Sequence, residues 1–232
     1  MPQRSANGAE VPSSRGPRRY RSLTSGDIAD AALDVVVRDG FDRLTMRSVA
    51  AQLQHPVMNL YHYVDGKDAL LDLVLERVLE SVETSEASGD WRADVTSTLD
   101  QLRTALTLYP GAARILASRP SAGPHALRIA EALLASLSQG GLDGRRLVAA
   151  YTMLRDLVLG LALQGDVWRS TAAQTTDLEA LGDHLQTRLA GLPHVAANLS
   201  LLLQRDHEEQ FRFVVATTLT GLELGAAAAR DG

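Results

Sequence analysis

The chain has 232 residues, of which 45% are apolar and 4% aromatic, with a formal net charge of −5 and no cysteine. This apolar share can build a packed core, and the abundance of Leu and Ala favours helices, so we predict an all-α fold. The lack of cysteine excludes disulfides, Cys-ligated zinc and thiol catalysis, and it is compatible with a reducing cytoplasm.

Residues 1–22 are rich in Arg, Pro and Ser and have no apolar core, so we interpret them as a flexible tail and not as a secretory signal. No uninterrupted apolar run reaches the ~20 residues that a membrane span requires. We therefore expect a cytoplasmic protein with no membrane partner.

Charge is distributed unevenly along the chain. Residues 1–67 hold nine basic and seven acidic side chains, whereas residues 68–232 hold fourteen basic and twenty-one acidic ones. Local sign matters more than net charge when one face approaches phosphates. The first part of the chain is therefore compatible with nucleic-acid binding, although the asymmetry is modest.

Two amphipathic helices are predicted at the start of this part. The first can be capped by Thr24 or Ser25 and ends at Gly40. Its apolar residues follow the spacing of a helix with one buried face: Ile28, Ala31, Ala32, Val35 and Val36. Thr45 can cap a second helix of about two turns, which depends on packing against the first. Its apolar residues repeat the same spacing: Met46, Val49, Ala50 and Leu53.

A third short helix is predicted from Pro56 to Tyr63, because the fixed φ of proline suits a first helical position. At ~100° per residue, Leu60 and Val64 face the core together. The opposite side combines apolar, polar and aromatic groups: Met58, Asn59 and His62, flanked by Tyr61 and Tyr63. A DNA major groove accepts such a surface, since amides read adenine edges and apolar atoms contact thymine methyl groups. Residues 23–67 thus read as a helix-turn-helix unit.

Gly66-Lys67 opens the next predicted helix. A lysine beside the free N–H groups of a helix N-terminus is well placed to bind a backbone phosphate. The equally simple alternative is that Lys67 is only solvated.

These residues resemble the tetracycline-repressor (TetR) family of bacterial regulators, in the strings AALDVVVRDGFDRLTMRSVAAQL, NLYHYV and GKDALLD. The resemblance implies that Thr45 and Arg47 contact DNA from the second helix and that Lys67 contacts a phosphate. It implies further DNA contacts from the third helix: Val57, Met58, Asn59, Tyr61, His62 and Tyr63. The helical wheel, however, turns Val57 partly inward.

The turn between the second and third helices departs from the family pattern. The family usually has Gly-Val or a similar pair there, whereas this chain has Gln54 and His55. A non-glycine residue in a left-handed turn costs on the order of 1 kcal/mol. We therefore expect the angle of the turn, and with it the base contacts, to differ more than the fold does.

From Asp68 onward helical patterns continue almost without a break, and we assign residues 68–232 to a helical effector-binding and dimerisation domain. The predicted helices are a continuation of the fourth to Val82, then Asp90 to Tyr109, Gly123 to Gly140, Gly144 to about Trp168, a short helix containing His184, and about His207 to Ala229.

The strings Trp91-Arg92, LYPGAARILASRP and FRFVVATTLTGLELG resemble the C-terminal domain of the subgroup nearest the tetracycline repressor itself. The resemblance implies a homodimer in which the long helix and the last helix form a four-helix bundle with their copies. An apolar stripe on the last helix agrees with this: Phe211, Val214, Val215, Thr218, Leu219, Leu222 and Ala226. Gly160, Gly221 and Gly225 allow close helix approach. The alternative is that the stripe is buried within one subunit.

The resemblance also implies a ligand cavity among the fourth to eighth helices, for which Glu83, Arg119 and Trp168 are candidate lining residues. The metal-ligating histidine of tetracycline-binding members falls on Ile115 or Leu116 here, and neither can ligate. We therefore expect an effector other than a metal–tetracycline complex.

Two other classes of protein compete with this interpretation. For an enzyme, no HExxH, ExxH, nucleophile elbow or phosphate-binding glycine loop is present. The pairs Asp183-His184 and Asp206-His207 are not preassembled, because adjacent helical residues project ~100° apart. We thus expect no catalytic residue, metal site or cofactor. The second alternative is a helical protein-interaction adaptor whose helix-turn-helix has lost DNA affinity.

We therefore predict a homodimeric transcriptional regulator that responds to a ligand. As a repressor, it would hold a palindromic DNA operator and release it when a small-molecule effector binds to residues 68–232.

Overall fold

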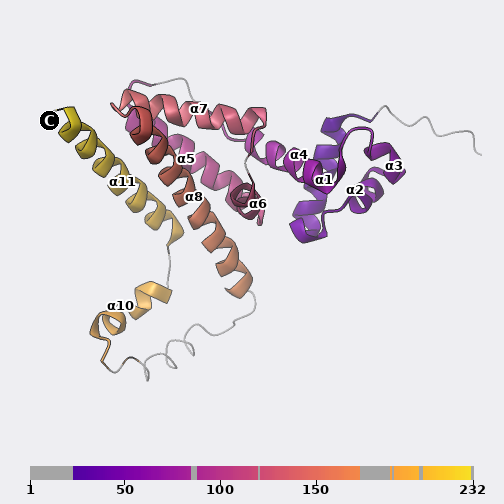
Figure 1. Cartoon of the computed structure of the whole chain (residues 1–232). Helices are drawn as coiled ribbons and strands as arrows, with labels where there is room; N and C mark the ends of the chain where they lie inside the picture. The colour runs from indigo at the N-terminus through magenta and orange to yellow at the C-terminus, as the bar shows by residue number, and fades with distance from the viewer. Residues whose placement is uncertain are drawn as a thin grey trace, which may run out of the picture.

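The computed structural model describes residues 23–84, 88–119, 121–172, 189, 191–203 and 206–230, with 167–172 and 229–230 described by backbone alone. The regular elements of these residues are all helices (Figure 1), which confirms the predicted all-α fold. They are α1 (Ser25–Asp39), η1 (Phe41–Arg43), α2 (Met46–Leu53), α3 (Val57–Leu60), α4 (Gly66–Glu80), α5 (Trp91–Leu108), α6 (Ala112–Ser118), α7 (Pro124–Gln139), α8 (Gly144–Ala172), α10 (Pro193–Leu203) and α11 (His207–Arg230). The predicted tail and the predicted helix around His184 lie outside the described residues.

The first two helices begin at reciprocal caps. In α1 the Thr24 hydroxyl accepts from the Asp27 N–H at 3.1 Å, and the Asp27 carboxylate accepts from the Thr24 N–H at 2.9 Å. In α2 the Thr45 hydroxyl accepts from the Ser48 N–H at 3.0 Å, and Ser48 returns a bond to the Thr45 backbone. Both caps satisfy N–H groups that helix ends leave without partners. The predicted starts of α1 and α2 are therefore confirmed, with Thr24 as the first cap.

The turn after α2 is closed by a residue in the left-handed conformation, Gln54, with φ 56° and ψ 35°. The N–H groups of Gln54 and His55 donate back to carbonyls of α2, the latter to Ala50 at 3.0 Å. This is the arrangement that glycine normally closes at a helix C-terminus. The left-handed conformation of this turn therefore falls on a non-glycine residue, Gln54, while the expected difference in turn angle stays a prediction.

The third helix is shorter than predicted. Regular α-helix covers only Val57–Leu60, and the chain then continues in a turn in which the Tyr63 N–H donates to Leu60 at 3.0 Å. Pro56 is the residue before the helix and has an extended ψ of 137°, so its assignment as the first helical residue was wrong. The predicted core side chains Leu60 and Val64 are both buried, so the orientation of the segment was predicted correctly.

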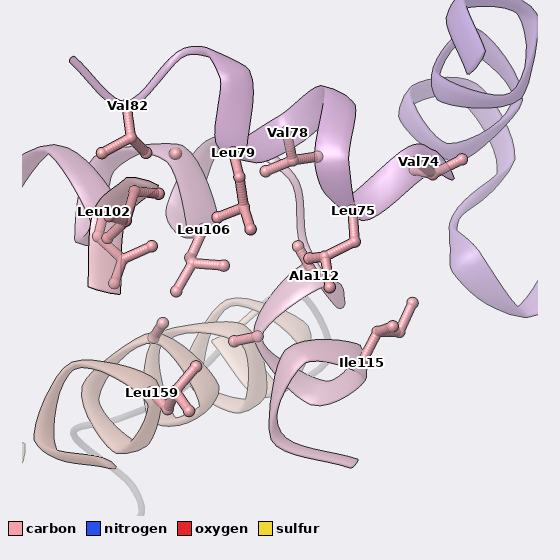
Figure 2. Packing of buried hydrophobic residues seen from close by; sticks show 14 of the residues in the cluster. Val74, Leu75, Val78, Leu79, Val82, Leu102, Leu106, Ala112, Ile115 and Leu159 are labelled. Carbon is pink, nitrogen blue, oxygen red and sulfur yellow. The ribbon is translucent and has the colours of Figure 1, made fainter. Parts of the chain in front are cut away.

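Helix α4 connects the first three helices to the rest of the molecule. Its five buried apolar residues are Leu70, Val74, Leu75, Val78 and Leu79. They belong to one continuous core that includes residues of α1 on one side and of α5 and α6 on the other. Figure 2 shows this face of α4 opposite Leu102 and Leu106 of α5 and Ala112 of α6. Burial of each such side chain contributes about 1.5–3 kcal/mol, so α4 is held firmly against both halves.

The remaining helices pack as a bundle in which α5 lies against α7 and α8, and α11 lies against α8 and α5. Arg103 of α5 holds α11 through an ion pair with Glu208 at 2.6 Å, and its guanidinium lies over the Phe211 ring. Helix α10 extends away from this bundle (Figure 1) and has no buried residue. Helices α6 and α10 were not predicted from the sequence.

The stripe predicted for the dimer interface is largely used within the subunit. Phe211, Val215, Leu219 and Ala226 of α11 are buried in the single chain. The opposite side of α11 instead exposes Phe213 and Leu224, with exposed fractions of 70% and 67%. The interpretation of that stripe as the dimer face was therefore wrong for its buried members.

Two helices, α8 over Gly144–Asp166 and α11 over His207–Ala228, are long and apolar enough to cross a membrane by length and composition. Charged residues interrupt both of them, and part of each is buried against other helices of the chain. Core helices meet the same criterion, so the expected absence of a membrane partner stays a prediction.

The left-handed residue at the end of α2 gives a stability prediction. We expect Gln54→Gly to raise the free energy of unfolding by up to about 1 kcal/mol, because glycine adopts a positive φ without steric cost. The matched control, Ala51→Gly in the last turn of α2, should lower it by about 1 kcal/mol. Urea unfolding followed by circular dichroism measures both. A loss of stability in Gln54→Gly would contradict the assignment of strain to this residue.

Candidate DNA-binding surface and effector cavity

The recognition segment, residues 56–63, presents most of its predicted DNA-contacting side chains to solvent. Met58 has an exposed fraction of 71%, and Tyr61, His62 and Tyr63 are also exposed. Asn59 is half-buried. An exposed methionine beside two exposed tyrosines is costly for a surface with no partner, so this segment has the character of a binding surface.

Val57 is the exception in the recognition segment. It is half-buried and packs against the core, as the helical wheel indicates. Its first role in the structure is therefore to hold α3 against the rest of the unit, and a DNA contact from its remaining exposed atoms stays a prediction.

The other predicted DNA-contacting residues lie at helix N-termini. Thr45 is the cap of α2, and Arg47 is the second residue of that helix and is exposed. Lys67 is the second residue of α4 and is exposed too, while Asp65 before it forms no side-chain cap. Helix N-termini carry partial positive charge and unpaired N–H groups. These positions combine that feature with two cationic side chains.

Helix α6 connects this unit to the bundle at two further points. A Cβ atom at Gly111 would lie 2.8 Å from the ring of Phe41, so only glycine permits this approach of the backbone to η1. Arg114 of α6 forms an ion pair with Asp42 of η1 at 2.7 Å. Neither contact was predicted, because nothing in the local pattern of either segment points to the other.

A cavity of about 160 Å³, here called the central cavity, lies between α4, α5, α6, α7 and α8. Its wall is mostly apolar and includes Leu79, Leu102, Leu116 and Leu133. Among the described lining residues only Arg119 and Arg155 are charged. Leu116, at one of the two positions where tetracycline-binding members would have their metal ligand, presents an apolar side chain to this space.

The three predicted effector residues differ in where they lie. Arg119 lines the central cavity. Glu83 is exposed, lies beyond the end of α4, and is not among the residues that line this cavity. The side chain of Trp168 lies outside the described residues. The position of Glu83 therefore does not support its predicted role, whereas that of Arg119 does.

Arg119 also holds the first turn of α4. Its guanidinium donates to the Asp68 carboxylate at 2.7 Å, to the Asp68 carbonyl at 2.9 Å and to the Asp72 carboxylate at 2.9 Å. The hydrogen bonds to Asp72 and then to Asp68 raise the pKa of the Arg119 side chain above its ordinary value. One permanently charged group is thus shared between the cavity wall and the helix that carries Lys67.

A third carboxylate of α4 holds the start of α7. Glu76 accepts hydrogen bonds from the backbone N–H groups of His125 at 2.8 Å and Ala126 at 3.3 Å. Gly123, the cap residue of α7, supplies no side-chain bond, and a Cβ there would overlap the Glu76 carboxylate. Glu76 thus caps α7 from a neighbouring helix.

We call Asp68, Asp72 and Glu76 the acidic face of α4, since their i, i+4, i+8 spacing puts them on one side of the helix. A hollow of about 450 Å³ beside this face is lined by Asp72 and Glu76 and also by Tyr63 of the recognition segment. This face was not predicted, although the regular spacing of the three carboxylates was a usable signal. In the described part of the chain, no group of His, Asp or Glu is arranged to hold a metal ion.

Comparison with known proteins places this architecture in a family. The model for the tetracycline repressor-like C-terminal domain matches residues 83–225. An HTH-type transcriptional regulator of Saccharopolyspora erythraea is 36% identical over 177 residues, which cover 76% of this chain and 75% of that protein. The HTH-type transcriptional repressor DrrR1 of Streptomyces coeruleorubidus is 33% identical over 226 residues, covering 94% and 83%. The chain belongs to the tetracycline-repressor family of transcriptional regulators.

The fold of the family is retained over most of the chain. The crystal structure of apo ActR from Streptomyces coelicolor, a TetR family protein, superposes with a TM-score of 0.79 at 26% identity, covering 90% of this chain and 99% of ActR. The resemblance stated from the sequence is therefore confirmed. Because the TetR family consists of regulators, the enzyme alternative is set aside.

The cap that Glu76 provides generates a second stability prediction. We expect Glu76→Gln to lower the free energy of unfolding by about 1–2 kcal/mol, because an amide oxygen replaces a charged acceptor at a helix N-terminus. Urea unfolding measures the change. Glu131→Gln, which alters an exposed residue of the same helix α7, should change stability by less than about 0.5 kcal/mol. Equal effects of the two variants would contradict the capping role.

Proposed function

We propose that this TetR-family regulator is a cytoplasmic homodimer that represses transcription from a palindromic DNA operator and releases it when a small-molecule effector enters the central cavity. One observation carries the proposal. The exposed recognition segment and the central cavity adjoin the same helix, α4, whose first turn is held by a residue of the cavity wall. Occupation of the cavity can therefore alter the position of the DNA-binding surface.

The DNA-contacting part of the proposal assigns roles by side-chain chemistry. Lys67, and the N-termini of α2 and α4, suit phosphates, which position the protein without reading sequence. Arg47 and Asn59 suit base edges, since a guanidinium matches guanine and an amide matches adenine. Met58, Tyr61, His62 and Tyr63 supply apolar contact, stacking and polar atoms on the same exposed surface. Thr45 caps α2 two residues before Arg47, and we assign it a contact with the DNA backbone.

The dimer is proposed to form through α8 and α11. In addition to Phe213 and Leu224 of α11, the apolar side chains of Val148 and Met153 of α8 are exposed. A Cβ atom at Gly160, Gly221 or Gly225 would meet nothing within 4 Å in the single chain, so these glycines leave open space for a neighbour. A second copy that covers this apolar surface also supplies the second recognition segment, and a palindromic operator requires the two segments about 34 Å apart.

Repression and effector release are supported by relatives. DrrR1, which aligns with 94% of this chain, is named a transcriptional repressor. ActR has been solved in complex with actinorhodin, and that structure superposes on this chain with a TM-score of 0.78. An effector that binds preferentially to a conformer with differently spaced recognition segments would shift the population off DNA. Near-complete release requires a preference of ~10⁴-fold.

The experiment that tests the proposed function is a footprint on the DNA that flanks the gene of this protein. Protection of a symmetric sequence is expected for a regulator, and reporter expression should rise when the gene is deleted. An absence of specific protection even at low salt would overturn the DNA-binding assignment and leave the protein-interaction adaptor as the interpretation.

Phosphate and base contacts should differ in their response to mutation. We expect Lys67→Gln to weaken binding to all DNA sequences and to reduce the slope of log K against log salt by about 1. Arg47→Ala and Asn59→Ala should change base preference by about 1–3 kcal/mol at a contacted pair. Fluorescence anisotropy on operator and mutated operators measures both effects. Arg212→Gln, an exposed position on α11, is the control and should change neither; uniform losses in all variants would contradict these roles.

The proposed interface predicts a separable effect on assembly. Gly221→Leu should convert the dimer to a monomer, since the added side chain meets free space in one chain but a neighbour in the bundle. Phe213→Glu should do the same by burying a charge. Sedimentation velocity measures the oligomeric state, and circular dichroism checks the fold. Val37→Glu, at an exposed apolar position of α1, serves as control; a dimer that persists in both test variants would rule out this interface.

A further inference from the structure

The two arginines of the central cavity stand where it meets a second hollow. This adjoining hollow, of about 480 Å³, lies between α6 and α8 and shares Leu116, Arg119 and Arg155 with the central cavity. The only acidic side chain among its described lining residues is Asp156, which is already paired with Arg155 at 2.8 Å. The described wall thus presents two guanidinium groups to a bound apolar molecule, and its one carboxylate is already paired.

Arg119 differs from its acidic partners in its exposure to solvent. The exposed fraction of the Arg119 side chain is 24%, whereas those of Asp68 and Asp72 are 84% and 58%. Ion pairs of exposed carboxylates contribute little, because water solvates the carboxylates almost as well when the pair is broken. An anion that approaches Arg119 from the cavity side is less screened by water and interacts more strongly. An anion in the cavity therefore competes with Asp68 and Asp72 for the Arg119 guanidinium.

We propose that the effector is an apolar, ring-containing acid whose anionic group binds Arg119 and displaces Asp68 and Asp72 from it. This inference rests on the proposed function, because it names the effector class and the first step of release. The cavity supplies the apolar contacts for the ring system, and Arg119, with Arg155 beside it, supplies the charge-assisted hydrogen bonds. A neutral ligand of the same shape gains only the apolar contacts.

The displacement acts on one end of α4. Asp68 follows Lys67 directly, so loss of its bonds to Arg119 frees the first turn of the helix, next to the recognition segment. Glu76 keeps its bonds to α7, since they do not involve Arg119. The buried face of α4 is also unaffected. The change therefore begins at the DNA-binding end, while the rest of α4 stays in place.

Two fluorescent probes of the same skeleton test the charge requirement on the full-length protein. 8-Anilino-1-naphthalenesulfonate carries an anionic group, and N-phenyl-1-naphthylamine lacks it. We expect the anionic probe to bind wild type about tenfold or more tightly than the neutral probe, as charge-assisted hydrogen bonds allow. Arg119→Gln should reduce this preference to within about threefold. Arg114→Gln, which alters an exposed arginine of α6 that does not line the cavity, should retain the preference for the anionic probe.

A gain of affinity tests the competition itself. Asp72→Asn removes charge from the competing carboxylates at nearly constant shape, so the anionic probe should bind about three- to tenfold more tightly while the neutral probe is unchanged. The gain cannot arise from misfolding. Asp30→Asn, which removes an acidic partner of Arg77 on the other side of α4, is the matched control and should leave both affinities unchanged.

Each outcome decides the proposal. Equal affinities of wild type for the two probes overturn it, and so does a preference that survives in Arg119→Gln, which would move the anion site to Arg155. Unchanged affinity in Asp72→Asn overturns the competition with the acidic face. The footprint of wild type on DNA is read separately. Specific protection without a charge preference rejects only this inference, whereas a charge preference without protection rejects the proposed function.

Discussion

Helix α4 is the constraint on which the rest of the molecule depends, because its apolar and polar sides contact different neighbouring helices. Val74, Leu75 and Leu79 are buried in a core that extends from α1 to α5 and α6. Arg77, on a third side, forms an ion pair with Asp30 of α1 at 2.7 Å. The acidic face of α4 holds the end of α6 and the start of α7. Polar contacts thus connect α4 to the end of α6 and the start of α7, while apolar contacts hold it against α1 and α5.

The sequence was sufficient wherever local chemistry alone determines structure. Thr24 and Thr45 cap their helices as predicted. Each hydroxyl accepts from the N–H three residues later, and the side chain of that residue bonds back to the threonine backbone, so the cap depends only on nearby residues. Leu60 and Val64 are buried as predicted, because the Val64 N–H donates to the Leu60 carbonyl at 2.9 Å and keeps the two residues one turn apart beyond the end of α3. The exposed side of the recognition segment follows from the same geometry. These local rules were enough to predict the fold class and which side of the recognition segment is exposed.

Local rules failed where a long-range contact decides the outcome. Regular helix ends at Leu60 because the chain must turn toward α4, which the period of the segment does not report. Helix α6 has only seven residues and is too short to be stable by itself. Contacts of Arg114 with Asp42, and of the flanking Gly111 with Phe41 and Arg119 with Asp68, help to hold it in place. Arg119 was predicted as a cavity residue, but its bonds to α4 connect positions that are about fifty residues apart in the chain. No periodicity encodes such a pair.

The last helix shows the same limit in another form. A helix with apolar residues on two sides has two candidate interfaces, and the sequence does not say which of them is covered first. In α11 the side with Phe211 and Val215 is covered by the chain itself, and the side with Phe213 and Leu224 is not.

Because burial of either side of α11 removes apolar surface from water, the helix gains stability from both. The intrachain side is covered as the subunit folds, so the face left for a second copy is the one that the first packing step leaves open. For α8, which exposes Val148 and Met153, the same reasoning applies. In the proposed dimer, the interface therefore forms on surface that the folded subunit leaves uncovered, which includes the three open glycines and not the buried part of the apolar stripe.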